Sequence, residues 1–232
     1  MEAPDSVYVA LASRASWAKR LLLVAGLVDT LAVITGLASY RLADRAASGS
    51  ATFEQFNAAE ARHDLVILTQ MAVYLITAIV FIRWFHRAYA NLPAIGIEEL
   101  RHGTCWAIGA WFVPIISLIW PKQIADEIWQ GSDPLLEAHQ GRNRRKGKVP
   151  LFIGVWWLAF IASSLLVGAG WELWGDAKTY SDIKFAAGIE ITGNAIAVLS
   201  GVLAYVVVDR ASERQQARAM RIAIWRPLAA QI

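Results

Sequence analysis

A single carboxylate, Asp29, lies inside a long apolar run and is the residue of this chain best placed to do chemistry. It follows Arg20 by nine residues within the stretch Trp17–Tyr40. A charged carboxylate at the centre of a membrane helix costs roughly 2.5–3.5 kcal/mol, so Asp29 is expected to be protonated or paired inside the protein. Tyr74 and Ser200 lie at a similar depth in two other apolar runs, and we predict that the Tyr74 hydroxyl donates a hydrogen bond to Asp29. This polar site either binds a proton or cation, or simply links helices through a hydrogen bond.

Glu190 and Asn194 form a second polar group, because a spacing of four residues places both on one face of a helix. Glu172 lies nearby, at the start of the hairpin between the last two apolar runs. We interpret these three residues as an outer polar cluster. The cluster is either a small vestibule or, more simply, a solvated helix end with weak ion pairs.

The remaining reactive side chains form no catalytic or metal-binding pattern. The four histidines, His63, His86, His102 and His139, offer no pair that faces each other at one depth, as two axial haem ligands must. The single cysteine, Cys105, excludes an intramolecular disulfide and a multi-cysteine zinc site. We interpret it as a small buried apolar residue. No paired nucleophile and base stands out, so we expect no metal, no cofactor and no enzymatic activity.

Four long apolar runs must position these polar residues. An average soluble domain is about 25% charged, whereas this 232-residue chain is 18% charged and 56% hydrophobic. Each run reaches the roughly 20 residues that a helix needs to cross the hydrocarbon core of a bilayer. The predicted transmembrane helices are 17–39, 65–86, 149–171 and 185–208. The first run is longer than the roughly 7–15 residues of a signal-peptide core, so we expect it to be retained.

A fifth apolar segment, 103–120, is shorter, contains Pro114 and is followed by Pro121. If this segment does not span the membrane, 17 of the 22 lysines and arginines fall on one side and 5 on the other; if it spans, the division is 14 and 8. Cytoplasmic segments are enriched in lysine and arginine, which favours the first division. We therefore predict an all-α membrane protein with four spanning helices, both termini in the cytoplasm, and a proline-broken re-entrant or interfacial segment.

The cytoplasmic side is predicted to carry amphipathic and basic segments. Residues 122–130 form a short amphipathic helix suited to the membrane surface, and the basic tail 209–232 continues the last helix. We expect the basic side chains to meet the anionic lipids of the inner leaflet or an acidic partner. These side chains are Arg142, Arg144, Arg145, Lys146, Lys148, Arg210, Arg214, Arg218 and Arg221. The net charge of only +3 gives no reason to expect nucleic acid as a partner.

Two local patterns predict how helices begin and pack. Thr52 and Gln55 have the spacing of a capping box, and no glycine or proline interrupts a helix from Phe53 to Leu92. The second pattern is a stripe of small residues that lets two helix backbones approach closely, and we favour packing within the chain over a dimer contact. Its residues are Gly193, Ala197 and Gly201.

Residues 81–134 contain the most specific motif of the chain. An aromatic-x-x-Trp-x-x-Arg-Ala-x-x-Asn-Leu pattern ends the second apolar run, and a Trp-Ala-x-Gly-x-Trp-Phe-x-Pro segment leads from there to a second proline and the amphipathic helix. The motif residues are Trp84, Arg87, Asn91, Trp106, Gly109, Trp111, Phe112, Pro114 and Pro121. This stretch resembles a bacterial family of multi-pass membrane proteins that is classed as a domain of unknown function. The resemblance implies a location in the bacterial cytoplasmic membrane and no established activity.

A proline-broken apolar segment at membrane depth must be shielded by protein or line a cavity, because lipid cannot bond its free backbone groups. We expect Arg87 and Asn91 to bond the carbonyls freed at Pro114 or Pro121. The leading functional hypothesis is a non-enzymatic interaction or accessory component that contacts lipid, another membrane protein or a second copy of itself. The alternative is a small proton- or cation-coupled transporter or channel that uses Asp29.

Overall fold

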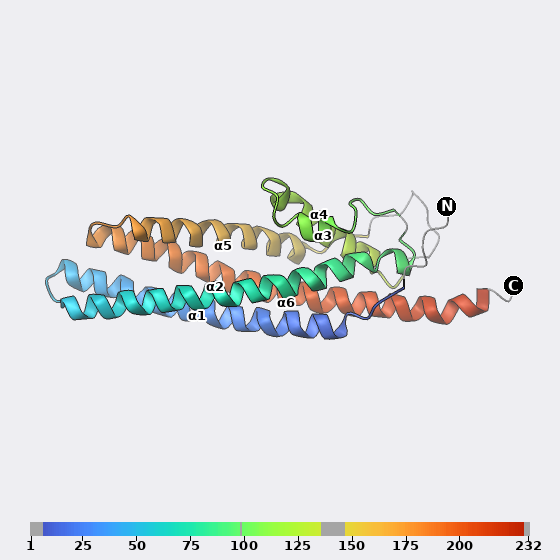
Figure 1. The fold of residues 1–232 in the computed structure, drawn as a ribbon, viewed down its shortest axis with the longest axis horizontal. Coiled ribbons are helices and arrows are strands. Elements are labelled where there is room, and N and C mark those ends of the chain that lie inside the picture. Colours follow the sequence, from blue (N-terminus) through green and yellow to red (C-terminus); the bar gives the residue numbers. More distant parts are fainter. Residues whose placement is uncertain (1–6, 98, 136–146, 230–232) are drawn as a thin grey trace. The chain divides into compact units, whose positions relative to one another are not determined.

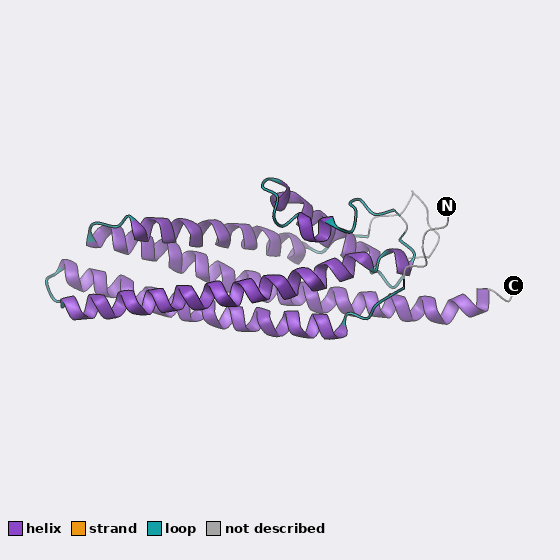
Figure 2. Cartoon of the chain, in the orientation of Figure 1, coloured by secondary structure: helices purple, strands orange, loops and turns teal. Residues whose placement is uncertain are grey.

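A computed structural model of the chain describes residues 7–97, 99–135 and 147–229. Across these residues the protein is helical and contains no strand (Figure 1 and Figure 2). The elements are α1 (Ala12–Ala47), α2 (Phe53–Ala90), the short 3-10 helix η1 (Pro93–Ile95), α3 (Trp106–Gly109), α4 (Ile116–Gly131), α5 (Leu151–Gly175) and α6 (Tyr180–Ala229). Four helices, α1, α2, α5 and α6, are long and apolar enough to cross a membrane. The predicted all-α membrane fold is therefore confirmed.

The long helix α2 begins where the capping pattern predicts. The backbone N–H of Thr52 donates to the Gln55 side-chain oxygen at 3.2 Å, and the Gln55 N–H donates to the Thr52 hydroxyl at 3.3 Å. These reciprocal bonds satisfy backbone donors that a helix start leaves free. The helix then continues for 38 residues to Ala90, as its uninterrupted sequence predicts.

The segment 103–120 does not form a spanning helix in the structure. It contains the four-residue α3 and a turn, and α4 begins at Ile116. Ile115 has a φ of 68° at that turn, a left-handed conformation that non-glycine residues rarely adopt. The prediction that Pro121 precedes a separate amphipathic helix is wrong, because α4 passes through Pro121. The proline ring fixes a helical φ but removes one backbone donor inside the helix, and α4 continues past it to Gly131.

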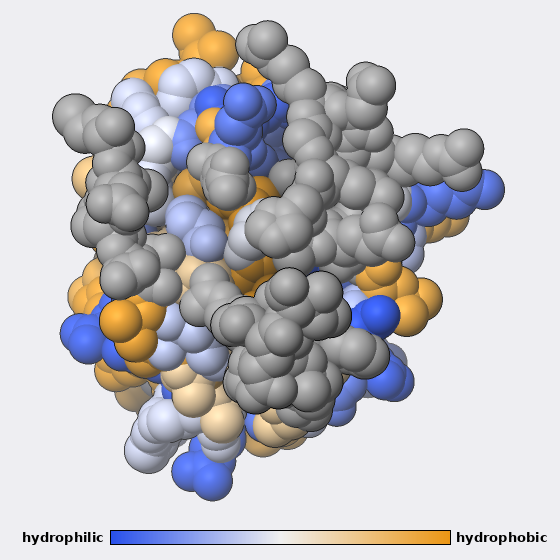
Figure 3. Space-filling model, turned by 90° about the vertical axis from the view of Figure 1, so that its right-hand side faces the viewer, coloured by the Kyte–Doolittle hydropathy of each residue, from blue (hydrophilic) through white to orange (hydrophobic). Residues whose placement is uncertain are grey.

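The chain divides into two compact units, and the division falls within the long helices. The hairpin unit comprises Met1–Arg20, Ala78–Gly154 and Tyr205–Ile232, and the bundle unit comprises Leu21–Thr77 and Val155–Ala204. Trp84, Phe85 and Tyr89 are almost fully buried in the hairpin unit. The face of the molecule drawn in Figure 3 carries hydrophilic side chains beside apolar ones, as expected for a surface that meets water or headgroups.

Glycines bring the helices of the bundle unit close together. A Cβ atom added at Gly193 would come within 2.9 Å of the Val167 backbone nitrogen on α5, and one added at Gly201 would lie 3.8 Å from the Leu22 carbonyl oxygen on α1. Ala197, between them, is half-buried. The small-residue stripe thus packs within the chain, as predicted.

The apolar face of α4 is covered by protein in the hairpin unit. Ile124, Ala125 and Ile128 are at most 3% exposed, and a Cβ atom at Gly131 would lie only 2.9 Å from the Leu92 side chain. The expectation that this face rests on the membrane surface is therefore wrong for its centre. Hydrophobic burial against α2 and the following loop satisfies the face, which local amphipathicity alone does not reveal.

Candidate functional site

Asp29 of α1 is 3% exposed and accepts hydrogen bonds from two residues of α2. The Tyr74 hydroxyl donates to Asp29 Oδ1, which confirms the predicted bond. Gln70 Nε2 donates to the same oxygen at 3.1 Å. Ser200 is buried, but the described hydrogen bonds of Asp29 do not include it. The buried carboxylate is thus held mainly by α2.

Gln70 extends this arrangement to α6. Its Nε2 also donates to Asn194 Oδ1 at 2.8 Å, and both side chains are buried. The sequence interpretation missed Gln70, although its position four residues before Tyr74 places the two side chains on one face of the helix. An amide in the middle of an apolar run, in register with the expected partner of Asp29, was the available signal.

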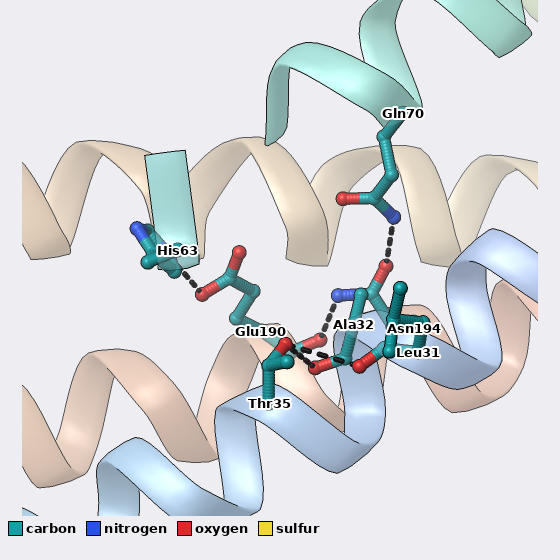
Figure 4. A network of polar contacts seen from close by, with 7 residues as sticks. All are labelled: Leu31, Ala32, Thr35, His63, Gln70, Glu190 and Asn194. Carbon is teal, nitrogen blue, oxygen red and sulfur yellow. Dashed lines mark hydrogen bonds and ion pairs between the residues drawn. The ribbon is translucent and has the colours of Figure 1, made fainter. Parts of the chain in front are cut away.

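Glu190 and His63 form a buried pair. His63 Nε2 and Glu190 Oε2 are 3.0 Å apart, and the two residues are 6% and 7% exposed. The imidazole ring stacks on the Trp174 indole of α5 at a centroid distance of 4.1 Å. Asn194 Nδ2 donates to the Glu190 backbone oxygen at 3.0 Å, as Figure 4 shows.

This burial corrects the interpretation of the outer polar cluster. Glu190 and Asn194 do not lie at a solvated helix end, whereas Glu172 is exposed. The reason is the close approach of α5 and α6, since a Cβ atom added at Gly170 would lie 3.0 Å from Glu190 Cβ. His63, which precedes the predicted helix 65–86, is enclosed as well.

Six residues of the bundle unit thus form a connected group, which we call the polar ladder, and its link from Asn194 to Glu190 goes through the Glu190 backbone carbonyl. They are Asp29, Tyr74, Gln70, Asn194, Glu190 and His63. Three members carry ionisable side chains: two carboxyl groups and one imidazole. Among the described residues no group of three or more His, Cys, Asp or Glu side chains has the arrangement of a metal site. The chemistry that the ladder offers is therefore proton exchange and hydrogen bonding.

Asn91 is the centre of a second buried network, in the hairpin unit. Its Oδ1 accepts from the Val9 backbone N–H at 3.1 Å and its Nδ2 donates to the Val9 carbonyl at 2.8 Å. Arg87 Nη2 donates to the Val7 carbonyl at 3.0 Å. The expectation that Arg87 and Asn91 bond carbonyls near Pro114 or Pro121 is therefore wrong. They hold the segment before α1 instead, a contact between positions about 80 residues apart that no local pattern indicates.

The motif tryptophans connect α2 with α6 and with the segment that contains α3. Trp84 is fully buried, and its Nε1 donates to the Ser212 hydroxyl at 2.9 Å. Trp111 packs edge-on against Phe81 and Phe85, with centroids 5.8 and 5.6 Å apart. The remaining motif residues form the turn around α3. The ring centroids of Trp106 and Trp120 are 4.6 Å apart, and a Cβ atom added at Gly109 would lie 3.5 Å from the Trp106 ring. Phe112 is 72% exposed, and Pro114 is also exposed.

The basic residues of α6 contact protein to a greater extent than predicted. Arg218 is 1% exposed and donates to the carbonyls of Ile95 and Asp133 at 3.0 and 2.8 Å. Arg214 pairs with the Asp133 carboxylate at 3.2 Å, and Arg221 donates to the Pro134 carbonyl at 2.9 Å. Arg218 is thus enclosed by protein and does not face lipid or a partner, because free carbonyls at the end of α4 and in the η1 turn attract its guanidinium group. Arg214 is half-buried and Arg221 is exposed, so for these two the expected contact with lipid or an acidic partner stays a prediction.

Three further expectations have different outcomes. Arg210 is exposed and pairs with Glu213 at 3.5 Å, and Lys148 is exposed, so both remain available to lipid or a partner. Arg142, Arg144, Arg145 and Lys146 lie outside the described residues. Cys105 is exposed, which corrects its interpretation as a buried apolar residue.

Comparison with known proteins assigns the chain to a family without naming an activity. The family model described as Domain of unknown function (DUF4328) matches residues 47–213. This range covers most of the chain, including every member of the polar ladder except Asp29. Neither the curated proteins nor the solved structures gave a match. With the motif, the four apolar helices and the matched region taken together, the chain belongs to the DUF4328 family of membrane proteins.

Proposed function

We propose that this protein is a small proton- or cation-coupled transporter or channel whose working site is the polar ladder. The observation that carries the proposal is the burial of Asp29, His63 and Glu190 within an apolar bundle. Gln70 joins Asp29 to Asn194, and Asn194 bonds the Glu190 backbone carbonyl. One hydrogen-bonded pair suffices to link two helices. Three titratable groups in such surroundings are costly to keep, and this cost marks a functional site by default.

The geometry of each carboxyl group suits proton exchange. Both donors to Asp29 use Oδ1, so Oδ2 is the oxygen that takes the proton when the group is neutral. His63 Nε2 and Glu190 Oε2 are close enough at 3.0 Å to share one proton directly. Uptake or release of a proton at either position changes a buried charge and therefore changes the interactions that hold α1, α2 and α6 together.

The orientation follows from charge, and we place the protein in the bacterial cytoplasmic membrane with both termini in the cytoplasm. The division of lysines and arginines supports this placement. We further propose that the turn between α3 and α4 re-enters the inner leaflet. Trp111 packs on Phe81 and Phe85, at the end of the apolar run of α2, and Phe112 and Ile115 beside it are 72% and 76% exposed. Lipid is the solvent in which such side chains are stable.

A second candidate function is that of a non-enzymatic accessory component. The exposed apolar turn that includes Phe112 and Ile115 supports it, because apolar side chains of this kind also suit the surface of another membrane protein. In this role the lipids of the inner leaflet, a partner helix or a second copy of the chain contact the turn. The same cytoplasmic orientation applies.

Proton flux into liposomes separates the two candidates. The purified protein is reconstituted with an internal pH-sensitive dye, and flux is driven by a potassium gradient with valinomycin. We expect flux in the wild type and its loss in Asp29→Asn. Thr30→Val is the matched control, because Thr30 is the neighbouring polar residue, is exposed, and donates its hydroxyl to the Gly26 carbonyl of its own helix. An inactive wild type would eliminate the transport proposal and leave the accessory role, whereas undiminished flux in Asp29→Asn would remove Asp29 from the mechanism.

A further inference from the structure

The segment Val7–Leu11 of the hairpin unit, which we call the strap, is held by hydrogen bonds to its backbone. Asn91 bonds both the N–H and the carbonyl of Val9, and Arg87 bonds the carbonyl of Val7 two residues earlier. Two bonds to one residue and a third to the residue two positions away are the pattern by which an extended polypeptide is held along its backbone. Leu11 anchors the end of the strap at 3% exposure.

These contacts involve the backbone of the strap and not its side chains. The Val7 side chain is 76% exposed, and Ala10 is also exposed. Tyr8 is half-buried, but its hydroxyl is a buried group that makes no hydrogen bond with the described residues. A site of this kind accepts other extended segments, because every non-proline residue offers the same N–H and carbonyl.

Hydrogen bonds to neighbouring residues fix the side chains beneath the strap. Asn91 is fully buried, and its Nδ2 also donates to Gln215 Oε1 at 2.9 Å. Gln215 Nε2 in turn donates to the Ala88 carbonyl at 2.9 Å and to the Ser132 hydroxyl at 3.2 Å. The Gln215 amide therefore holds the Asn91 amide in the orientation that bonds a backbone N–H and carbonyl. This reduces the entropy cost of binding a polypeptide segment.

The charge of the site favours a segment that carries a carboxylate. Arg87 uses Nη2 for the strap, whereas its Nε is buried and has no hydrogen-bond partner among the described residues. Arg14 adds a second positive charge near Arg87. A guanidinium binds a carboxylate more strongly than it binds a neutral carbonyl such as that of Val7.

We propose that the site formed by Arg87, Asn91 and Gln215 beneath the strap binds an extended, acidic polypeptide segment of a partner protein, and that the strap is the chain's own occupant, which the partner displaces. The proposal is independent of proton transport and concerns the other unit of the chain. The strap is tethered to the site, so its effective concentration there is high, and a free segment binds only to the fraction of molecules in which the strap has left. Loosening the strap must therefore increase the affinity for a free segment.

The test uses the full-length protein in nanodiscs and a fluorescent peptide with the sequence of residues 1–11, MEAPDSVYVAL. Val9→Pro removes the N–H from which Asn91 Oδ1 accepts a hydrogen bond. It leaves Arg87, Asn91 and Gln215 unchanged. Loss of that bond should tighten peptide binding by roughly tenfold, which corresponds to about 1.4 kcal/mol. Val7→Pro is the matched control: it keeps the carbonyl that Arg87 uses, and we expect wild-type binding.

Two further experiments test the site formed by Arg87, Asn91 and Gln215 and its preference for an acidic segment. Adding Asn91→Leu to Val9→Pro should abolish binding, and a peptide with Gln and Asn in place of Glu2 and Asp5 should bind several-fold more weakly. Equal binding by Val9→Pro and the wild type, or binding that persists with Asn91→Leu, would overturn the proposal. Equal binding of the neutral peptide would overturn its acidic part.

A measurement without proline guards against misfolding of Val9→Pro. In the background Cys105→Ser, a nitroxide at Val7→Cys reports the mobility of the strap in an otherwise unchanged protein. Addition of millimolar peptide should increase that mobility as the strap is displaced. A spectrum that stays unchanged would contradict displacement, whatever the behaviour of the proline variant.

Discussion

Replacement of Gln70 by leucine tests whether the polar ladder holds the bundle unit together. Gln70 donates to Asp29 Oδ1 at 3.1 Å and to Asn194 Oδ1 at 2.8 Å. Asp29 and Asn194 are 3% and 0% exposed, so neither oxygen finds water when the amide is removed. Leucine has nearly the same volume, and the loss is therefore one of hydrogen bonds and not of packing.

The expected magnitude follows from these two bonds. Interhelical hydrogen bonds in membranes average about 0.6 kcal/mol, whereas a buried acceptor left without its donor costs about 1–3 kcal/mol. Asp29 keeps the Tyr74 bond, which limits its loss. We expect Gln70→Leu to lower the free energy of unfolding by about 1–3 kcal/mol, measured by denaturation in mixed micelles.

The neighbouring residue Thr69 provides the control. Its hydroxyl bonds the Leu65 carbonyl of its own helix at 2.7 Å and is exposed, so Thr69→Val should change the free energy of unfolding by less than about 0.5 kcal/mol. If Gln70→Leu is as stable as Thr69→Val, the ladder does not stabilise the bundle and the reasoning is refuted.

Three further predictions concern packing, the arginines of α6 and the apolar turn. Gly193→Ala should destabilise the protein by about 1–3 kcal/mol because the added Cβ collides with α5. Gly188 has open space around it, so Gly188→Ala should be neutral or slightly stabilising in the same denaturation assay. Equal effects of the two substitutions would argue against the close contact at Gly193. Arg218→Met should cost about 2–3 kcal/mol through the loss of its carbonyl bonds, and the exposed Arg210→Met should cost less than about 0.5 kcal/mol; a neutral Arg218→Met would show that the bonds do not form. A fluorophore attached to Phe112→Cys in a cysteine-free background should be quenched by brominated lipids in liposomes, and quenching by aqueous iodide instead would exclude re-entry.

Much of the fold follows from local signals. The four long helices are predictable from the length of their apolar runs, and the start of α2 from the spacing of Thr52 and Gln55. The bond between Tyr74 and Asp29 was predictable because few hydrogen-bonding side chains lie at the depth of Asp29, so a buried carboxylate has few partners to choose from.

The rest depends on contacts between residues far apart in the chain. Glu190 is buried with His63 because Gly170 lets α5 and α6 approach, a fact about helix pairing that the sequence of α6 does not contain. The arginines of α6 form a basic face, but whether that face meets lipid or protein depends on carbonyls near Ile95 and Asp133. Residue type indicated which groups need partners, and the tertiary fold decided which partners they have.

Infrared difference spectroscopy of the carboxyl groups tests the central claim most directly. The protein in liposomes is titrated, and the carbonyl stretch of protonated carboxylic acids is followed as the pH changes. Our account predicts pH-dependent bands from the polar ladder, one that disappears in Asp29→Asn and one that disappears in Glu190→Gln. If neither substitution removes a pH-dependent band, the buried carboxyl groups do not exchange protons and the ladder is not a proton site.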